Sequence, residues 1–108
     1  MASLITEFGN SFRGRTVVLF FHSVTCRPCR EIEITLREEA TRAHCEIVRL
    51  ETSLYPGVSE EYCVNVTPTI ILASFDEYNR VKIRGRLVGA DHEALKRLLR
   101  ALPIKHAL

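Results

Sequence analysis

The feature that most constrains the fold is the apolar run Thr16 to His22, TVVLFFH. β-branched and aromatic side chains favour extended backbone, and apolar side chains at successive positions give a strand two apolar faces. Such strands are typical of α/β sheets that helices cover on both sides. The run is also far too short to cross a bilayer. It therefore predicts a central strand in a layered domain and no membrane association.

The residues after this run change to a helical period. One apolar stripe recurs at spacings of three and four, made of Cys29, Ile32, Leu36 and Ala40. Pro28 falls in the first turn, where its missing N–H has no cost. The segment 45–50 (CEIVRL) then reads as a strand. This β–α–β order predicts two parallel strands joined by a right-handed crossover.

The remaining segments complete one domain over residues 1–108. We expect a helix over 3–12 with Leu4, Ile5, Phe8 and Phe12 on one side, a turn at 55–57, a short helix at 59–63, strands at 69–74 and 81–86 joined by a turn at 76–79, and a last helix that Asp91 caps and Pro103 ends. The length of 108 residues, 46% hydrophobic and 26% charged, suits one globular domain. The predicted fold class is α/β, a mixed four-stranded sheet with helices on both faces.

The net charge and the number of cysteines limit the classes of function that the chain can have. The net charge of +2 is too small to indicate a nucleic-acid partner, and no nucleic-acid motif accompanies it. The N-terminal segment lacks a basic stretch leading into an apolar one, so we expect a cytoplasmic location without secretion. Cysteines are normally reduced there. The four cysteines therefore indicate catalysis, metal binding or core filling.

The motif Cys26-Arg27-Pro28-Cys29 lies between the buried strand and the amphipathic helix. Cys26 falls at the helix N-terminus, where unpaired N–H groups and the helix dipole favour a thiolate, and Arg27 and Arg30 add positive charge. We therefore expect a lowered pKa for Cys26, which makes it the nucleophile. Cys29 lies one turn later on the apolar stripe, and this spacing brings the sulfurs within reach of a disulfide. The pattern predicts an exposed attacking cysteine and a shielded resolving one.

At this point the chain resembles the thioredoxin family. The likeness rests on VVLFF, on TCRPC opening a helix, on Val66-Thr67-Pro68-Thr69 before a strand, and on LVGADHEALKRLLRAL at 87–102. It covers Thr16 to Leu102 and implies a thioredoxin-like fold, closest to the four-stranded core of glutaredoxin-like members. It also implies a cis peptide bond at Thr67–Pro68, in a loop that binds the substrate. We expect Thr67, Pro68, Arg27 and Pro28 to contact the substrate.

The chain departs from the family pattern near the motif. Thr25 replaces the aromatic residue that usually precedes the first cysteine, Arg27 replaces a glycine, and Phe20 replaces a buried acid that helps to deprotonate the resolving cysteine. His22 is a candidate proton acceptor for Cys29 instead, although it also suits a strand end beside solvent. Arg49 stands where the family often has a lysine close to that acid.

Several other residues admit two interpretations. Glu31 and Glu33 either tune the cysteine pair or belong to a solvated helix face. Cys45 and Cys63 are expected as small buried hydrophobic residues, with an accessory redox role as the alternative for Cys63. A zinc site using the motif with Cys45, Cys63 or His22 is the metal alternative. Structural zinc sites usually show a second close cysteine pair, so we expect no metal.

These observations predict a thiol–disulfide oxidoreductase that reduces protein disulfides through a redox-active Cys26–Cys29 pair. The resemblance implies that no cofactor is tightly bound. It further implies electron transport from a recycling reductase, often an NADPH-dependent flavoprotein, or from glutathione. The alternative is a non-catalytic thioredoxin-fold binding module in which the motif acts as a redox switch.

Overall fold

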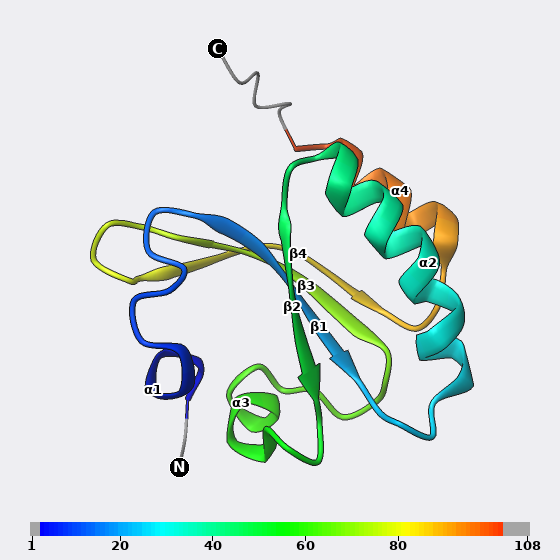
Figure 1. The fold of residues 1–108 in the computed structure, drawn as a ribbon, viewed down its shortest axis with the longest axis horizontal. Coiled ribbons are helices and arrows are strands. Elements are labelled where there is room, and N and C mark those ends of the chain that lie inside the picture. The colour runs from blue at the N-terminus through cyan, green and yellow to red at the C-terminus, as the bar shows by residue number, and fades with distance from the viewer. Residues whose placement is uncertain (1–2, 103–108) are drawn as a thin grey trace.

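A computed structural model describes residues 3–102 and shows a mixed four-stranded sheet in the order β2-β1-β3-β4 (Figure 1). β1 pairs with β2 in parallel, whereas β1–β3 and β3–β4 are antiparallel. The predicted four-stranded mixed sheet is therefore confirmed. In chain order the elements are α1 (Leu4–Phe8), β1 (Thr16–His22), α2 (Arg27–Arg42), β2 (Glu46–Glu51), α3 (Pro56–Glu61), β3 (Thr69–Phe75), β4 (Val81–Val88) and α4 (His92–Arg100).

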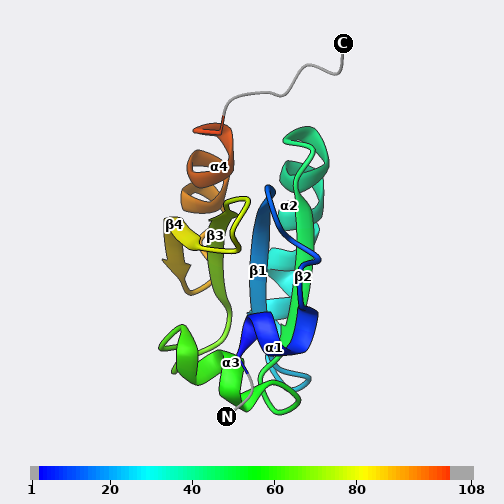
Figure 2. The ribbon, with the colours of Figure 1, turned by 90° about the vertical axis from the view of Figure 1, so that its left-hand side faces the viewer.

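Helices lie on both faces of this sheet, with α2 beside α4 and with α1 and α3 on the other side (Figures 1 and 2). Val18 and Phe20 of β1 pack in one apolar cluster with residues of α2 and α4, namely Cys29, Ile32, Leu36, Leu95 and Leu99. Val17, Leu19 and Phe21 pack in the second cluster with α1 and α3. The uninterrupted apolar run thus fills two separate cores, one on each side of β1.

The ends of α2 and α4 follow from their capping residues. Cys26 is the N-cap of α2, and Pro28 lies in its first turn, as predicted. Asp91 caps α4, its Oδ1 accepting a hydrogen bond of 3.0 Å from the Ala94 N–H. Leu98 and Leu102 are half-buried beside the buried Leu95 and Leu99 of α4. Pro103, predicted to end this helix, lies outside the described residues.

The N-terminal helix is shorter than predicted. It ends at Gly9, whose φ of 58° lies in the left-handed region that glycine adopts without strain. The chain then runs through turns to β1, although Phe12 still reaches the core at 4% exposure. The spacing places Ile5 on the same side as Leu4, yet Ile5 is 38% exposed whereas Leu4 is fully buried. The apolar spacing from Leu4 to Phe12 therefore reflects a short helix followed by turns.

The turn predicted at 55–57 is also wrong, because Pro56 opens α3. The fixed φ of proline suits the first helical position, so the dipeptide Pro56-Gly57 begins a helix here. That helix ends at Glu61, earlier than the predicted end at Cys63. Within residues 3–102, none of the helices is both long enough and apolar enough to pass through a membrane.

Candidate redox-active site

Cys26 and Cys29 form a disulfide in the structure, with their Cα atoms 5.2 Å apart. The spacing of three residues across the first helical turn therefore does bring the two sulfurs together, as predicted. Cys29 is 2% exposed and packs in the α2 core cluster, while Cys26 is half-buried at its edge. The pair is thus asymmetric. Cys26 is the residue of the pair that keeps contact with solvent.

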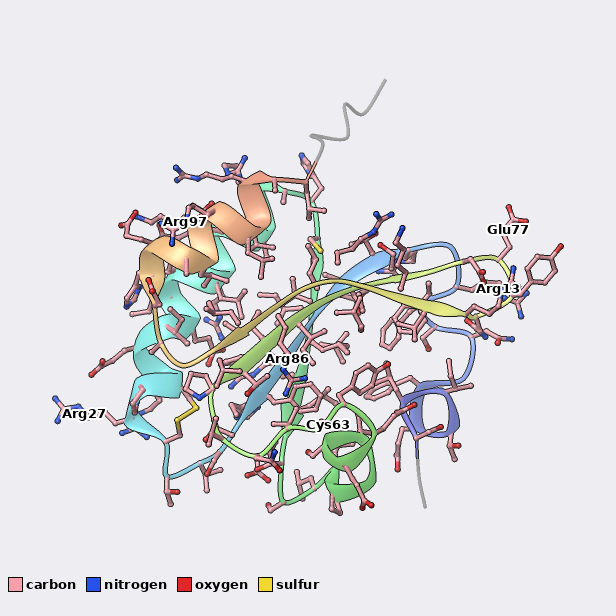
Figure 3. The ribbon with its side chains drawn as sticks, turned by 180° about the vertical axis from the view of Figure 1, so that it is seen from behind. Arg13, Arg27, Cys63, Glu77, Arg86 and Arg97 are labelled. Carbon is pink, nitrogen blue, oxygen red and sulfur yellow. A yellow bond between two sulfur atoms is a disulfide. The ribbon has the colours of Figure 1, made fainter. Side chains whose placement is uncertain are left out.

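The start of α2 supplies Cys26 with a hydrogen-bond donor. The backbone N–H of Cys29 donates to Cys26 Sγ at 3.1 Å, so this sulfur is the side-chain cap of the helix. A sulfur in this position lies at the positive end of the helix dipole, which favours negative charge. Arg27 projects away from the disulfide and is 83% exposed, paired with Glu31 at 3.3 Å (Figure 3). The charge of Arg27 is thereby partly offset.

The loop before β3 lies at the end of the sheet from which the chain runs on to Cys26. The Thr67–Pro68 peptide bond is cis, which confirms the expectation from the resemblance. Pro68 is buried, and its carbonyl accepts a hydrogen bond of 2.9 Å from the Gly89 N–H. Because Thr69 pairs with Phe21, β3 begins where β1 ends. The cis-proline loop and the turn that leads from β1 to the disulfide therefore share one end of the sheet.

Arg86 of β4 anchors the chain that leads to this loop, a role that the sequence did not reveal. Its Nη1 donates to the Tyr62 carbonyl at 2.5 Å and its Nη2 to the Cys63 carbonyl at 2.7 Å (Figure 3). These carbonyls follow α3, whose C-terminal end attracts positive charge. In the sequence, Arg86 is one of several alternating basic residues on an edge strand. Nothing in that pattern distinguishes it from a solvated side chain.

His22 lies at the end of β1 on the face that α2 covers. Its ring stacks on that of Phe20, with centroids 5.2 Å apart, and its strand partner in β2 is Glu51. The pKa of His22 is lowered, first by burial and then by the charge of Arg49, against the opposing effects of Glu33 and Glu51. A lowered pKa leaves the ring neutral at neutral pH, so it can accept a proton.

The two glutamates of α2 near the disulfide differ in their surroundings. Glu31 is exposed and pairs with Arg27, as expected of a solvated helix face. The side chain of Glu33 is only 15% exposed, and its Oε2 lies 2.7 Å from Arg49 Nη1 and 3.1 Å from Arg37 Nη2. Arg49 therefore has an acidic partner on α2, which the sequence could not show because the two residues belong to different elements.

The remaining cysteines do not join the pair. Cys63 is exposed with φ 55°, so its predicted burial is wrong. It follows α3, where the chain turns through the left-handed region. Cys45 is half-buried, and its Sγ lies 3.3 Å from the Thr16 carbonyl. Among residues 3–102, no group of three or more histidine, cysteine or acidic side chains is placed to hold a metal ion.

Comparisons with known proteins agree with this geometry. No protein-family model matches the chain. In sequence it is 27% identical over 88 residues to Thioredoxin-1 of Drosophila melanogaster (70% of this chain, 82% of that protein). It is 32% identical over 84 residues to Thioredoxin H5 of Oryza sativa subsp. japonica, where the match covers 77% of this chain and only 58% of the relative.

Solved structures show the same fold. Oxidised mitochondrial Thioredoxin 3 from Saccharomyces cerevisiae superposes with a TM-score of 0.75 at 23% identity, covering 91% of this chain and 90% of that one. Thioredoxin of Fasciola hepatica gives 0.73 at 22% identity, with 89% and 88% covered. A chain from a study of thiol resolution in yeast mitochondrial 1-Cys peroxiredoxin via glutathione/thioredoxin systems gives 0.74 at 21% identity, with 94% and 92% covered. The predicted thioredoxin-like fold is confirmed.

Proposed function

We propose, from its relationship to the thioredoxin family in fold and in sequence, that this chain is a protein-disulfide oxidoreductase acting through Cys26 and Cys29. One observation carries the proposal. Cys26 is half-buried, its sulfur accepts a hydrogen bond of 3.1 Å from the N–H of Cys29, and this sulfur is bonded to a buried partner one turn along α2. This arrangement favours a thiolate at the reachable position and keeps the second thiol ready inside the protein.

The proposed reaction begins from the reduced pair. Cys26 thiolate attacks one sulfur of a substrate disulfide, the substrate S–S bond breaks, and its other sulfur leaves as a thiolate. The product is a mixed disulfide between Cys26 and the substrate. Cys29 then loses its proton and attacks Cys26 Sγ. The substrate leaves reduced, and the Cys26–Cys29 disulfide seen in the structure forms.

The substrate segment is proposed to lie between the disulfide and the cis-proline loop. Thr67 and Pro68 lie at the same end of the sheet as the start of α2. Their backbone is therefore suited to align an extended peptide beside Cys26. Arg27 and Pro28 are exposed in the first turn of α2 and complete the contact surface. Arg86 takes part indirectly, since it fixes the carbonyls of the segment that enters the loop.

Recycling requires an electron donor. We propose an NADPH-dependent flavoprotein reductase or glutathione, with no cofactor tightly bound to the chain itself. The structural neighbour from the study of peroxiredoxin resolution via glutathione/thioredoxin systems supports protein disulfides as the substrate class. The cytoplasmic location stays a prediction.

The test is reduction of insulin by dithiothreitol, with and without catalytic amounts of the protein. We expect catalysis by the wild type, none by Cys26→Ser, and a trapped mixed disulfide with Cys29→Ser. Cys63→Ser is the matched control, because this cysteine is exposed and lies outside the pair. Full activity in Cys26→Ser would overturn the mechanism. Oxidation of the wild type in a single stoichiometric round would instead favour a redox-switched binding module.

A further inference from the structure

The resolving cysteine needs a proton acceptor, and its surroundings offer few. Cys29 is 2% exposed and shares its cluster with Phe20, an apolar ring. On this face of the sheet, β1 carries Phe20 and then His22. Phe20 pairs with Arg49 of β2, and His22 pairs with Glu51. His22 is thus the titratable base that β1 places on this face, and Arg49, Glu33 and Glu51 act on its charge.

Glu33 brings a carboxylate to this place from α2. It follows Cys29 by four residues, so both side chains lie on the same side of the helix. Its 2.7 Å contact with Arg49 bridges α2 and β2, and its 15% exposure limits screening by water. On the same face of β3, the residue that pairs with Phe20 is Ile70, which carries no charge. The charged groups that act on His22 are therefore Glu33, Arg49 and Glu51.

We propose that the Glu33–Arg49 ion pair controls the charge of His22 and thereby the pH at which Cys29 can resolve the mixed disulfide. This inference rests on the proposed function, since it concerns the second half of that reaction. Arg49 favours the neutral ring, which is the form able to accept a proton. Glu33 stabilises the imidazolium after the proton has arrived. Glu33 and Arg49 are positioning residues here, because both act through His22.

The step balances as follows. Neutral His22 takes the proton of the Cys29 thiol, and the freed electron pair on sulfur forms the Cys26–Cys29 bond. The bond between Cys26 and the substrate breaks, and its electron pair leaves on the substrate sulfur. His22 finishes protonated and returns the proton to water. Acid slows this step because it protonates His22 beforehand.

The first experiment measures His22 directly in the oxidised protein, independently of any activity. Proton NMR follows the imidazole resonances against pH, and loss of a signal in His22→Gln assigns the right one. Burial is the first cause of the lowered pKa of His22 and Arg49 the second, with Glu33 opposing. We therefore expect Arg49→Gln to raise the titration midpoint and Glu33→Gln to lower it. Arg49→Lys should resemble the wild type, and so should Glu38→Gln, an exposed glutamate of α2.

The second experiment times the resolving step alone. Reduced protein, in a Cys45→Ser, Cys63→Ser background, is mixed with 5,5′-dithiobis(2-nitrobenzoic acid) in a stopped-flow instrument. Attack by Cys26 releases one thionitrobenzoate, and attack by Cys29 releases the second. We expect His22→Gln to slow the second release by about 10²-fold or more and to leave a pH dependence set only by ionisation of the Cys29 thiol itself. Arg49→Gln should move that decline to higher pH, and Glu33→Gln to lower pH.

The decisive comparison repeats these two variants with His22→Gln present. Neither should then change the pH dependence of the second release. If both still shift it, the ion pair acts on the cysteine directly and the inference is overturned. An unmoved His22 midpoint in both variants overturns it as well. Neither experiment uses a protein substrate, so failure of insulin reduction would count against the proposed function alone.

Discussion

Gly85 of β4 is the position where an added methyl group has the clearest structural consequence. It lies at an irregularity of the β3–β4 pairing, where Leu72 faces Gly85 and Ala73 faces Ile83. Arg84 is therefore the extra residue of a bulge. A Cβ atom at position 85 would lie 2.2 Å from Leu98 Cδ1 and 3.5 Å from its Cγ. The leucine of α4 occupies the space that the missing side chain leaves.

The size of the effect follows from that distance. Carbon atoms pack best at about 3.5–4.0 Å, so Leu98 must move its methyl group by more than about 1 Å. Leu98 is half-buried, and the far end of its side chain can rotate. The cost should therefore fall within the usual range for overpacking, about 1–3 kcal/mol. For a domain of this length, each kcal/mol corresponds to a Tm lower by about 4–8 °C.

The assay is urea unfolding followed by far-UV circular dichroism, because the chain has no tryptophan. We expect Gly85→Ala to lower the free energy of unfolding, and the loss to shrink by about 1 kcal/mol or more when Leu98→Ala removes the clashing atoms. Equal losses in both backgrounds would refute the steric reasoning, as would a Gly85→Ala protein as stable as the wild type. Gly85 is remote from the cysteine pair in the sequence, so insulin reduction serves as a check on folding.

Three further predictions concern the caps, the ion pairs and the loop. In the reduced protein, Cys26→Ala should be less stable to urea than Cys26→Ser by about 0.5–2 kcal/mol, because serine keeps an acceptor for the Cys29 N–H; equal stability would contradict the capping role. The pKa of Glu39 is lowered from 4.5, chiefly by its hydrogen bond with Arg100, so its stabilising contribution is complete above pH 4.5 and is lost as the pH falls through the lowered value. Thermal unfolding of Glu39→Gln over a pH series should therefore show a shallower loss of stability in acid than the wild type. Arg86→Gln should raise KM for insulin severalfold with a smaller change in kcat, and a purely catalytic defect would argue against its loop-anchoring role.

The central part of the fold could be predicted because local and tertiary preferences agree there. The bounds of β1 are those of its apolar run, and the buried residues of α2 include the whole predicted stripe. A strand with two apolar faces must have both faces covered by other elements. A helix with one apolar stripe must turn that stripe toward the core. The place of Cys26 and Cys29 follows from these two elements alone.

The peripheral segments could not be predicted in the same way. Whether Pro56 sits in a turn or opens a helix depends on what the following residues contact, because both structures accept its φ. The exposure of Cys63 depends on a left-handed residue after α3, at φ 55°, which composition does not specify. Leu4 of α1 and Phe12 of the following turn pack in the same core cluster. A helix followed by a turn has no regular spacing of buried residues, so the sequence pattern could not reveal it.

Charged groups from α2 and β2 meet near the end of β1, an arrangement that only the tertiary structure reveals. An acid at the position of Phe20 would be fully buried, and desolvating a carboxylate there is costly. Glu33 keeps some exposure to water and has a guanidinium 2.7 Å away, so its charge is retained at lower cost. Phe20 packs in the same apolar cluster as Cys29. In the proposed mechanism the proton of Cys29 passes to a histidine at the strand end, and an ion pair between two elements sets the charge of that histidine.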